Sequence, residues 1–239
     1  MMRRIKRLVR RVTGRMPATP WVGSVRFGDF RRLEPFCRDY GYNRGLPVDR
    51  YYIEGFLSRH GKDIRGNVLE IGERAYTEQF GTAVAESHML HYSNHEGATY
   101  VDDLTTGKSV PDNMYDCVIF TQTLHLIYDM KSAIETLYRI LKPGGILLCT
   151  VPGITQISDN EWNPNWYWSL SPVSARRLFG EVFAEQDLEI ECHGNMLAAI
   201  SFLAGLAYEE LTPRELDHKD VEYPVIVAIA ARKGVATAG

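Results

Sequence analysis

The hydrophobic and polar positions of the chain follow two alternating patterns. Short, continuously apolar stretches typical of buried strands are separated by longer stretches whose apolar residues return every three or four positions, as on one face of a helix. The pattern predicts strands over 67–72, 86–93, 98–104, 117–121, 146–152, 188–194 and 223–233, and helices over 47–64, 129–145, 171–183 and about 195–209. We therefore predict an α/β protein with a Rossmann-like, doubly wound, mostly parallel seven-stranded sheet and helices on both faces.

The same pattern predicts how the chain is divided. Residues 1–46 lack a clean period and are predicted to form a basic N-terminal arm followed by an irregular cap. Residues 47–239 are predicted to form a single domain, a size that can bury one large core. Within that domain, residues 195–217 are predicted to be a helical insert between the last two strands.

Four segments in this order resemble class I S-adenosylmethionine-dependent methyltransferases of the small-molecule type. "VLEIG" (68–72) resembles the family's first motif, and "VDDL" (101–104) resembles the segment whose acid contacts the adenine. "YDCVIFTQTLHLIYD" (115–129) and "LYRILKPGGILLCTVPG" (137–153) resemble the fourth strand and the helix, turn and fifth strand that follow it. The resemblance implies that S-adenosylmethionine is the cofactor. It also implies methyl transfer to a hydroxyl or amine of a metabolite, natural product or sugar.

The resemblance also implies where the cofactor binds. Parallel sheets bind ligands beyond the carboxyl ends of their strands. The implied cofactor residues are Glu70, Gly72, His88, Asp103, Leu104 and Thr121. His88, or else His91, stands where the family has an acid at the end of its second strand.

The first motif is degenerate, because Gly72 is followed by Glu73, Arg74, Ala75 and Tyr76 where the family has further glycines. This departure leaves an alternative open. If Arg74 or Tyr76 fills the methionine pocket, the protein is a methyltransferase-like binding partner or catalyses another reaction in the same pocket.

Histidines and aromatic residues supply the candidate chemistry. His125, after the fourth strand, and His193, at the end of the sixth, are candidate bases because histidine titrates near neutral pH. The alternative for His125 is packing within the segment after the strand. Tyr128, Trp162, Trp166 and Trp168 are expected to wall an acceptor pocket or else to pack on the N-terminal cap. Asp129 is expected to cap the helix that begins at Met130.

Other chemistries are disfavoured. His88, His91 and His95 are close in sequence, but on a strand His88 and His91 point to opposite faces, so no metal site is predicted. A nicotinamide-dependent reductase would need a glycine fingerprint that is absent here. The four scattered cysteines contain no C-x-x-C pair, which favours a reducing, cytoplasmic location without disulfides.

The net charge of −3 hides an asymmetry. Residues 3–15 contain seven Lys and Arg and no acid, with Ile5, Leu8, Val9 and Val12 in one helical stripe, whereas the rest of the chain has 20 Lys and Arg against 30 acids. The basic stripe suggests peripheral contact with an anionic membrane or an acidic partner, and the alternative is a solvated or docked arm. The acidic remainder argues against nucleic acid as a partner and leaves a small-molecule substrate. The arginines interrupt any signal-peptide core.

Overall fold

The computed structural model describes residues 19–158 and 163–235 and divides into two compact units, Met1–Glu34 and Pro35–Gly239. In the first unit the described residues include a 3-10 turn, η1 (Gly28–Phe30). The side chains of Trp21, Val22 and Leu33 in this unit are almost fully exposed. The basic stripe at residues 3–15 lies outside the described residues.

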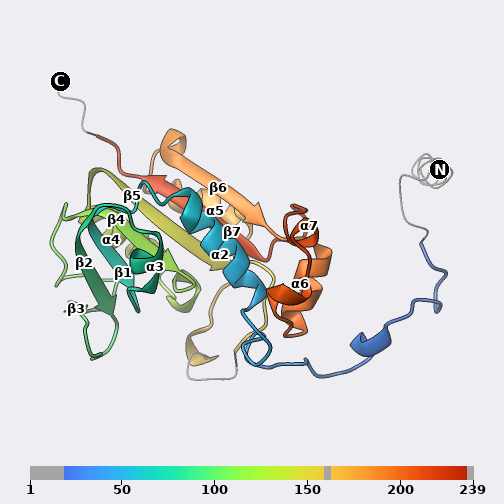
Figure 1. Ribbon diagram of the computed structural model, residues 1–239. Coiled ribbons are helices and arrows are strands. Elements are labelled where there is room, and N and C mark those ends of the chain that lie inside the picture. The colour runs from blue at the N-terminus through green and yellow to red at the C-terminus, as the bar shows by residue number, and fades with distance from the viewer. Residues whose placement is uncertain (1–18, 159–162, 236–239) are drawn as a thin grey trace. The chain divides into compact units, whose positions relative to one another are not determined.

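The second unit is built on one seven-stranded sheet, shown in Figure 1. Its strands are β1 (Gly66–Ile71), β2 (Val84–His91), β3 (Tyr100–Val101), β4 (Tyr115–Thr121), β5 (Leu141–Pro152), β6 (Leu188–His193) and β7 (Ile226–Arg232). Their order is β3-β2-β1-β4-β5-β7-β6. Six strands run in one direction, and β7 runs in the opposite direction. The predicted doubly wound, mostly parallel sheet is confirmed.

Helices cover both faces of the sheet, which explains why the central strands are apolar on both sides. α2 (Val48–Arg59), α3 (Ala75–Phe80) and α6 (Met196–Leu203) pack on one face, with Phe56, Tyr76 and Phe202 in the core. α4 (Met130–Ile140) and α5 (Pro172–Phe179) pack on the other face. The strand order reverses between β1 and β4, so the carboxyl ends of these two strands form the edge where a ligand is expected.

Several element boundaries differ from the sequence prediction, and the structure gives a clear reason for two of them. α4 ends at Ile140 instead of continuing to 145, because Leu141 already pairs with Tyr115 at the start of β4. β3 is only two residues long, because Asp102 leaves the strand and accepts hydrogen bonds from the amides of Asp103 and Ser109. The start of α4 agrees with the prediction, since Asp129 accepts a hydrogen bond from the Ser132 amide at 3.1 Å.

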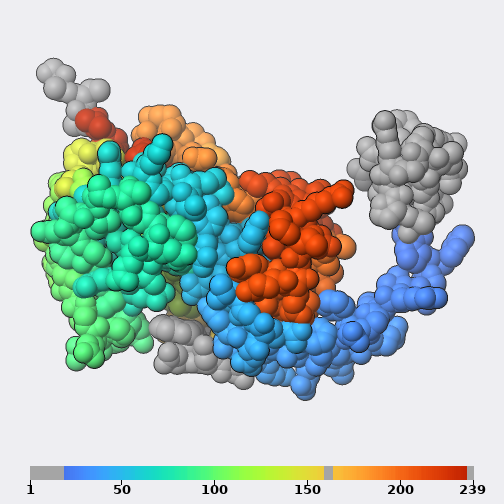
Figure 2. All heavy atoms as spheres, in the orientation of Figure 1, coloured from blue at the N-terminus to red at the C-terminus, as the bar shows by residue number. Residues whose placement is uncertain are grey.

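Residues 35–46 pack on the helical segment between β6 and β7, which contains α6, η5 (Tyr208–Glu210) and α7 (Pro213–Leu216). Phe36 N donates to Ala204 O at 2.7 Å, and Tyr208 N donates to Leu46 O at 2.9 Å. Figure 2 shows this blue segment against the orange-red helices. The structure thus divides the chain at Pro35, whereas the sequence pattern placed the boundary at 47. Within the described ranges no helix is both long and apolar enough to cross a membrane.

Candidate functional site

Gly72 directly follows β1 at the carboxyl edge of the sheet, in a left-handed conformation with φ +91°. A Cβ built on this glycine would meet no heavy atom within 4 Å. Arg74 and Tyr76 therefore do not occupy the space beside Gly72. Tyr76 is instead buried against α2, and Arg74 donates to Gly97 O and Thr99 Oγ1 in the loop before β3.

Glu70 holds the turn that follows Gly72. Its buried carboxylate accepts hydrogen bonds from the amides of Tyr76 and Thr77 at 3.1 and 2.8 Å and from the Thr77 hydroxyl at 2.7 Å. Burial raises the pKa of Glu70, and the hydrogen bonds from Thr77 oppose that shift. Glu70 thus replaces the side-chain cap that Arg74 does not provide at the start of α3. Glu70 thereby fixes the backbone that follows Gly72, and its role toward the cofactor stays a prediction.

The ends of β2 and β3 place their predicted residues differently. His88 lies three positions before the end of β2, where its Nδ1 is 3.0 Å from the Tyr115 hydroxyl at the start of β4. His91, the last residue of β2, is the histidine that reaches the carboxyl edge. Asp103 is exposed just after β3, and its Oδ1 accepts from the Thr105 amide at 2.8 Å. Leu104 beside it is buried in the core.

The segment after β4 contains Thr121 at the strand end and His125 in the short turn η2 (Leu124–Leu126). His125 is 2% exposed, and its Nδ1 is buried with no hydrogen-bond partner among the described residues. Burial lowers the pKa of His125 to about 4. The imidazole is therefore neutral at physiological pH and presents a buried nitrogen whose hydrogen bonding is not satisfied.

The aromatic loop packs on this same segment. The Trp166 ring lies 4.5 Å from His125 between centroids, and Tyr128 contacts both Tyr167 and Trp168. Trp168 Nε1 donates to Ile127 O at 3.2 Å. The structure thus brings together His125, Tyr128, Trp166 and Trp168, as a pocket wall requires. Trp162 lies outside the described residues.

The first turn of α2 contributes two charged residues that sequence inspection missed. Arg50 Nη1 donates to the Tyr76 hydroxyl, and Arg50 Nε donates to the Tyr42 hydroxyl at 3.1 Å. Oδ1 of Asp49 is buried and has no hydrogen-bond partner among the described residues. Burial raises the pKa of Asp49 to about 6, and the nearby Arg50 opposes the shift. Asp49 precedes Tyr52, Ile53 and Phe56 by three, four and seven positions, so it lies on the apolar stripe of the helix, and an acid in that stripe was the available signal.

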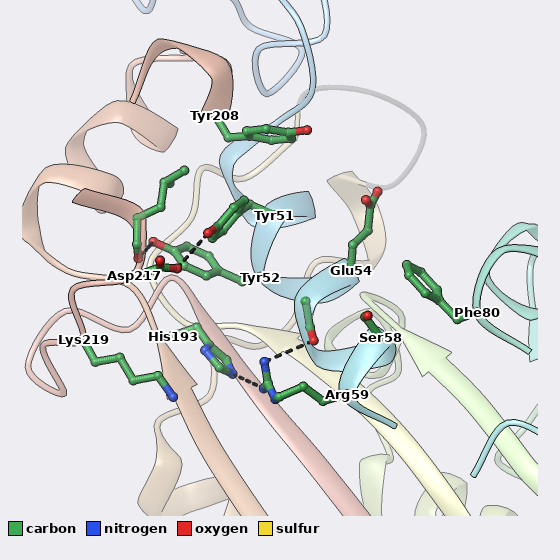
Figure 3. Close-up of a pocket in the computed structure, with 12 residues that line it drawn as sticks. Tyr51, Tyr52, Glu54, Ser58, Arg59, Phe80, His193, Tyr208, Asp217 and Lys219 are labelled. Carbon is green, nitrogen blue, oxygen red and sulfur yellow. Dashed lines mark hydrogen bonds between the residues drawn. The ribbon is translucent and has the colours of Figure 1, made fainter. Parts of the chain in front are cut away.

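A separate cavity of about 420 Å³ lies beside α2 and the end of β6 (Figure 3). Glu191 binds Arg59 at 3.0 Å, His193 at 3.1 Å and Lys219 at 3.4 Å. The Tyr51 hydroxyl donates to Asp217 at 2.7 Å. Burial lowers the pKa of His193 to about 4, against the opposing effect of Glu191. In this cavity Arg59, His193 and Lys219 share one carboxylate, and Asp217 is hydrogen-bonded to Tyr51.

The sheet order separates the two candidate histidines. β6 lies four strands from β1, and neighbouring strands are spaced by about 4.8 Å, so His193 is roughly 19 Å from the end of β1. Methyl transfer needs its reacting groups within direct contact. The structure therefore brings His125, but not His193, to the neighbourhood of the β1 and β4 ends.

Comparisons with known proteins agree with this architecture. Residues 36–193 match the family model described as "Methyltransferase domain". Among curated proteins, the chain is 39% identical over 49 residues to the ubiquinone/menaquinone biosynthesis C-methyltransferase UbiE of an Enterobacter strain and 41% identical over 49 residues to that of Pasteurella multocida. These alignments span about a fifth of either protein.

Solved structures are similar in fold at low identity. One is a SAM-dependent methyltransferase from Archaeoglobus fulgidus, with TM-score 0.51, 18% identity and coverage of 77% of this chain and 94% of that one. Another is phosphoethanolamine N-methyltransferase 2 of Haemonchus contortus, with TM-score 0.52, 18% identity and coverage of 89% and 61%. The [4+2]-cyclase SpnF has TM-score 0.52, 16% identity and coverage of 77% and 82%. With two thirds of its length matched by the family model, the chain belongs to the methyltransferase-domain family, and its fold is that of the class I S-adenosylmethionine-dependent enzymes, as the sequence predicted.

Proposed function

We propose that this protein binds S-adenosylmethionine at the carboxyl ends of β1 and β4 and transfers its methyl group to a hydroxyl or amine of a small molecule. The observation that supports this most directly is the open space at Gly72, which neither Arg74 nor Tyr76 enters. The missing glycines of the first motif are compatible with this function, because the cofactor has no phosphate for a glycine-rich loop to bind.

The residues at this edge fit the parts of the cofactor. Gly72 leaves room for the methionyl part, and Asp103 is exposed at the β3 end where the family contacts adenine. His91 takes the place at the β2 end that we first considered for His88 or His91, since only His91 reaches the edge. Thr121 lies at the end of β4, the strand that pairs with β1. When bound, S-adenosylmethionine supplies an activated methyl group on a sulfonium sulfur.

His125 is the proposed group for the acceptor's proton. Because its pKa is near 4, it is neutral and able to accept a hydrogen bond or proton at pH 7. A base of such low pKa is weak, so its main contribution is to orient the acceptor. Backbone bonds from Tyr167 and Trp168 to its carbonyl hold the segment in place. The Trp166, Tyr128 and Trp168 rings form the proposed wall of the acceptor pocket.

Calorimetric titration of the pure protein with S-adenosylmethionine and S-adenosylhomocysteine tests the proposal, together with thermal shift. Ligand at about 100 times its dissociation constant stabilises the fold by roughly 2.7 kcal/mol. Micromolar binding is expected. Transfer of an isotopically labelled methyl group to a panel of hydroxyl and amine acceptors then tests the chemistry. Absence of heat and of a thermal shift at millimolar cofactor would contradict the proposal.

A methyltransferase fold that performs another reaction is the second candidate. It is favoured by the departure at Glu73–Tyr76 and by the similarity in fold to a protein named as a [4+2]-cyclase. Cofactor binding without any methyl transfer across the acceptor panel would favour this candidate. The UbiE relatives are named as C-methyltransferases, but their alignments are too short to assign a carbon acceptor here.

We also propose that the N-terminal unit contacts an anionic membrane peripherally. Residues 1–34 contain ten Lys and Arg against two acids, and Trp21, Val22 and Leu33 are exposed. Basic charge beside exposed aromatic and aliphatic side chains favours the surface of anionic lipid. Sedimentation with phosphatidylglycerol vesicles is expected to capture the full chain and to be weakened by 0.5 M salt, with phosphatidylcholine vesicles as the control. Equal sedimentation with both kinds of vesicle, or with neither, would contradict this proposal.

A further inference from the structure

Arg50, in the first turn of α2, resembles Arg74 in having no acidic hydrogen-bond partner among the described residues, but Arg50 is held by two aromatic hydroxyls, whereas Arg74 binds the loop before β3. The Arg50 guanidinium is held by two neutral phenols, Tyr42 and Tyr76, and lies 5.4 Å from the centroid of the Tyr76 ring. Across the described residues, no carboxylate forms an ion pair with it. By contrast, Arg59 at the other end of α2 binds Glu191 and Arg44 binds Glu210. A half-buried guanidinium fixed by neutral groups is suited to bind an external anion.

Tyr76 places Arg50 next to the altered first motif. Tyr76 lies in the first turn of α3, whose amides are held by Glu70, and Glu70 is two residues before Gly72. The hydrogen bond between Arg50 and Tyr76 therefore joins the first turn of α2 to the loop that begins at Gly72. The guanidinium thus contacts Tyr76, the last residue of the altered segment Glu73–Tyr76.

Asp49 adds the opposite charge at the same place. Its Oδ1 is buried without a hydrogen-bond partner among the described residues, and an unsatisfied buried carboxylate oxygen normally costs stability unless a donor arrives. The groups that face it are Arg50 on its own helix, Tyr40 in the preceding segment and Tyr76 on α3. An acid and a base that are both incompletely paired, next to each other in sequence, match a zwitterion.

We propose that Arg50 and Asp49 recognise the α-amino-acid end of the cofactor, with Arg50 binding its carboxylate and Asp49 its ammonium group. This inference rests on the proposed binding of S-adenosylmethionine and deepens it. The first turn of α2 thereby replaces contacts that a glycine-rich loop would provide after β1. Tyr42 and Tyr76 act as positioning residues, because they orient the guanidinium and do not themselves contact the ligand.

Two ligands separate recognition of the amino-acid end from recognition of the nucleoside. S-adenosylhomocysteine contains both parts, whereas 5′-methylthioadenosine lacks the amino acid. Titration calorimetry would compare wild type, Arg50→Gln, Asp49→Asn and the control Arg59→Gln, which removes the same charge from the other end of α2. Thermal unfolding of each variant checks that it is folded.

The expected result is that wild type binds S-adenosylhomocysteine at least tenfold more tightly than 5′-methylthioadenosine. Arg50→Gln is expected to bind S-adenosylhomocysteine about 30-fold more weakly than wild type, and Asp49→Asn about tenfold more weakly. Both variants are expected to bind 5′-methylthioadenosine as wild type does. Unchanged binding of 5′-methylthioadenosine also shows that the variants are folded at the site. Arg50→Lys is expected to recover part of the loss, because the charge returns without the planar fork.

Different failures have different meanings. If Arg50→Gln binds S-adenosylhomocysteine as wild type does, or if wild type does not distinguish the two ligands, the inference is overturned while cofactor binding stands. If Arg59→Gln weakens binding as much as Arg50→Gln, the effect is one of general charge and the inference is also overturned. If wild type binds neither ligand, the proposed function itself fails and the inference fails with it.

Discussion

The two ends of α2 adjoin regions of similar composition whose charges are arranged differently. Near the first turn, Arg50 is bonded to two phenols, and Asp49 has a buried oxygen without a partner among the described residues. Near the last turn, Arg59, His193 and Lys219 all surround the single carboxylate of Glu191. Both regions contain tyrosines, an α2 arginine and an acid. The cations of the second region share a carboxylate, whereas in the first region no carboxylate forms an ion pair with Arg50 among the described residues.

This difference separates a structural cluster from a ligand site more clearly than cavity volume does. The Glu191 cavity has a volume of about 420 Å³, yet its cations share a carboxylate, and His193 at its β6 side lies roughly 19 Å from the β1 end. Unmatched buried charge costs folding free energy, and it persists where a ligand supplies the missing partner. The comparison therefore favours the first turn of α2, and the following variants test it.

The largest effect is expected from a matched pair of glycine substitutions. Gly72 and Gly144 both have left-handed backbones, with φ +91° and +82°, and an added Cβ has room at each. Alanine at either position is expected to cost about 1–2 kcal/mol of stability through backbone strain alone. Only Gly72→Ala is expected to weaken S-adenosylhomocysteine binding, by more than 30-fold in calorimetry, because its Cβ enters the proposed ligand space. Equal binding losses in both variants would contradict that placement.

The second effect concerns the contribution of Glu191 and its cationic neighbours to the stability of the fold. Glu191→Gln leaves Arg59 and Lys219 without their shared carboxylate and is expected to cost about 1–2 kcal/mol in urea unfolding, discounted for the partial exposure of these groups. Binding of S-adenosylhomocysteine is expected to remain at the wild-type value. A tenfold loss of ligand affinity would show that the Glu191 cavity belongs to the functional site, which would contradict its assignment as a structural cluster.

Much of the fold could be predicted because it depends on local patterns. The apolar strands and the Asp129 cap were legible in the sequence, since burial and capping leave regular signatures. The end of α4 was misplaced because the pairing of Leu141 with Tyr115 is a long-range contact. The contacts of Phe36 with Ala204 and of Leu46 with Tyr208 are likewise long-range, and no local pattern in residues 35–46 indicates them.

The site was less predictable than the fold. Gly72 and the cluster of His125 with the aromatic loop followed from motif positions. Arg50 and Asp49 were missed, because their importance depends on which partners they lack, and a sequence does not show partners. The sequence does not distinguish His193 from His125, because both lie at or after strand ends, and only the sheet order separates them. Whether each residue serves the cofactor stays a prediction until binding is measured.

A third test is the effect of acidification on stability, which depends on the buried His125 in the turn after β4. The pKa of His125 is lowered to about 4 in the native state, against about 6.5 when unfolded, so the unfolded chain takes up a proton between these values and the native state does not. Stability is therefore full above pH 6.5 and falls as the pH decreases toward 4. Between pH 7 and 5.5, wild type is expected to lose about 1 kcal/mol more than His125→Asn in urea unfolding. Parallel pH profiles would contradict a buried neutral imidazole.

The smallest effect compares the tyrosine hydroxyl bonded to Arg50 with a tyrosine hydroxyl in the lining of the Glu191 cavity. Tyr42→Phe removes the 3.1 Å bond to Arg50 Nε, and Tyr51→Phe removes the 2.7 Å bond to Asp217. Each loss is expected to cost about 0.5–1 kcal/mol of stability. Because Tyr42 orients the guanidinium while Tyr76 still holds it, Tyr42→Phe is expected to weaken S-adenosylhomocysteine binding about threefold, which corresponds to roughly 0.6 kcal/mol. Tyr51→Phe is expected to leave the binding unchanged. If Tyr51→Phe weakened S-adenosylhomocysteine binding and Tyr42→Phe did not, the ligand would bind in the Glu191 cavity. The presence or absence of ion pairs would then no longer tell the ligand site from the structural cluster.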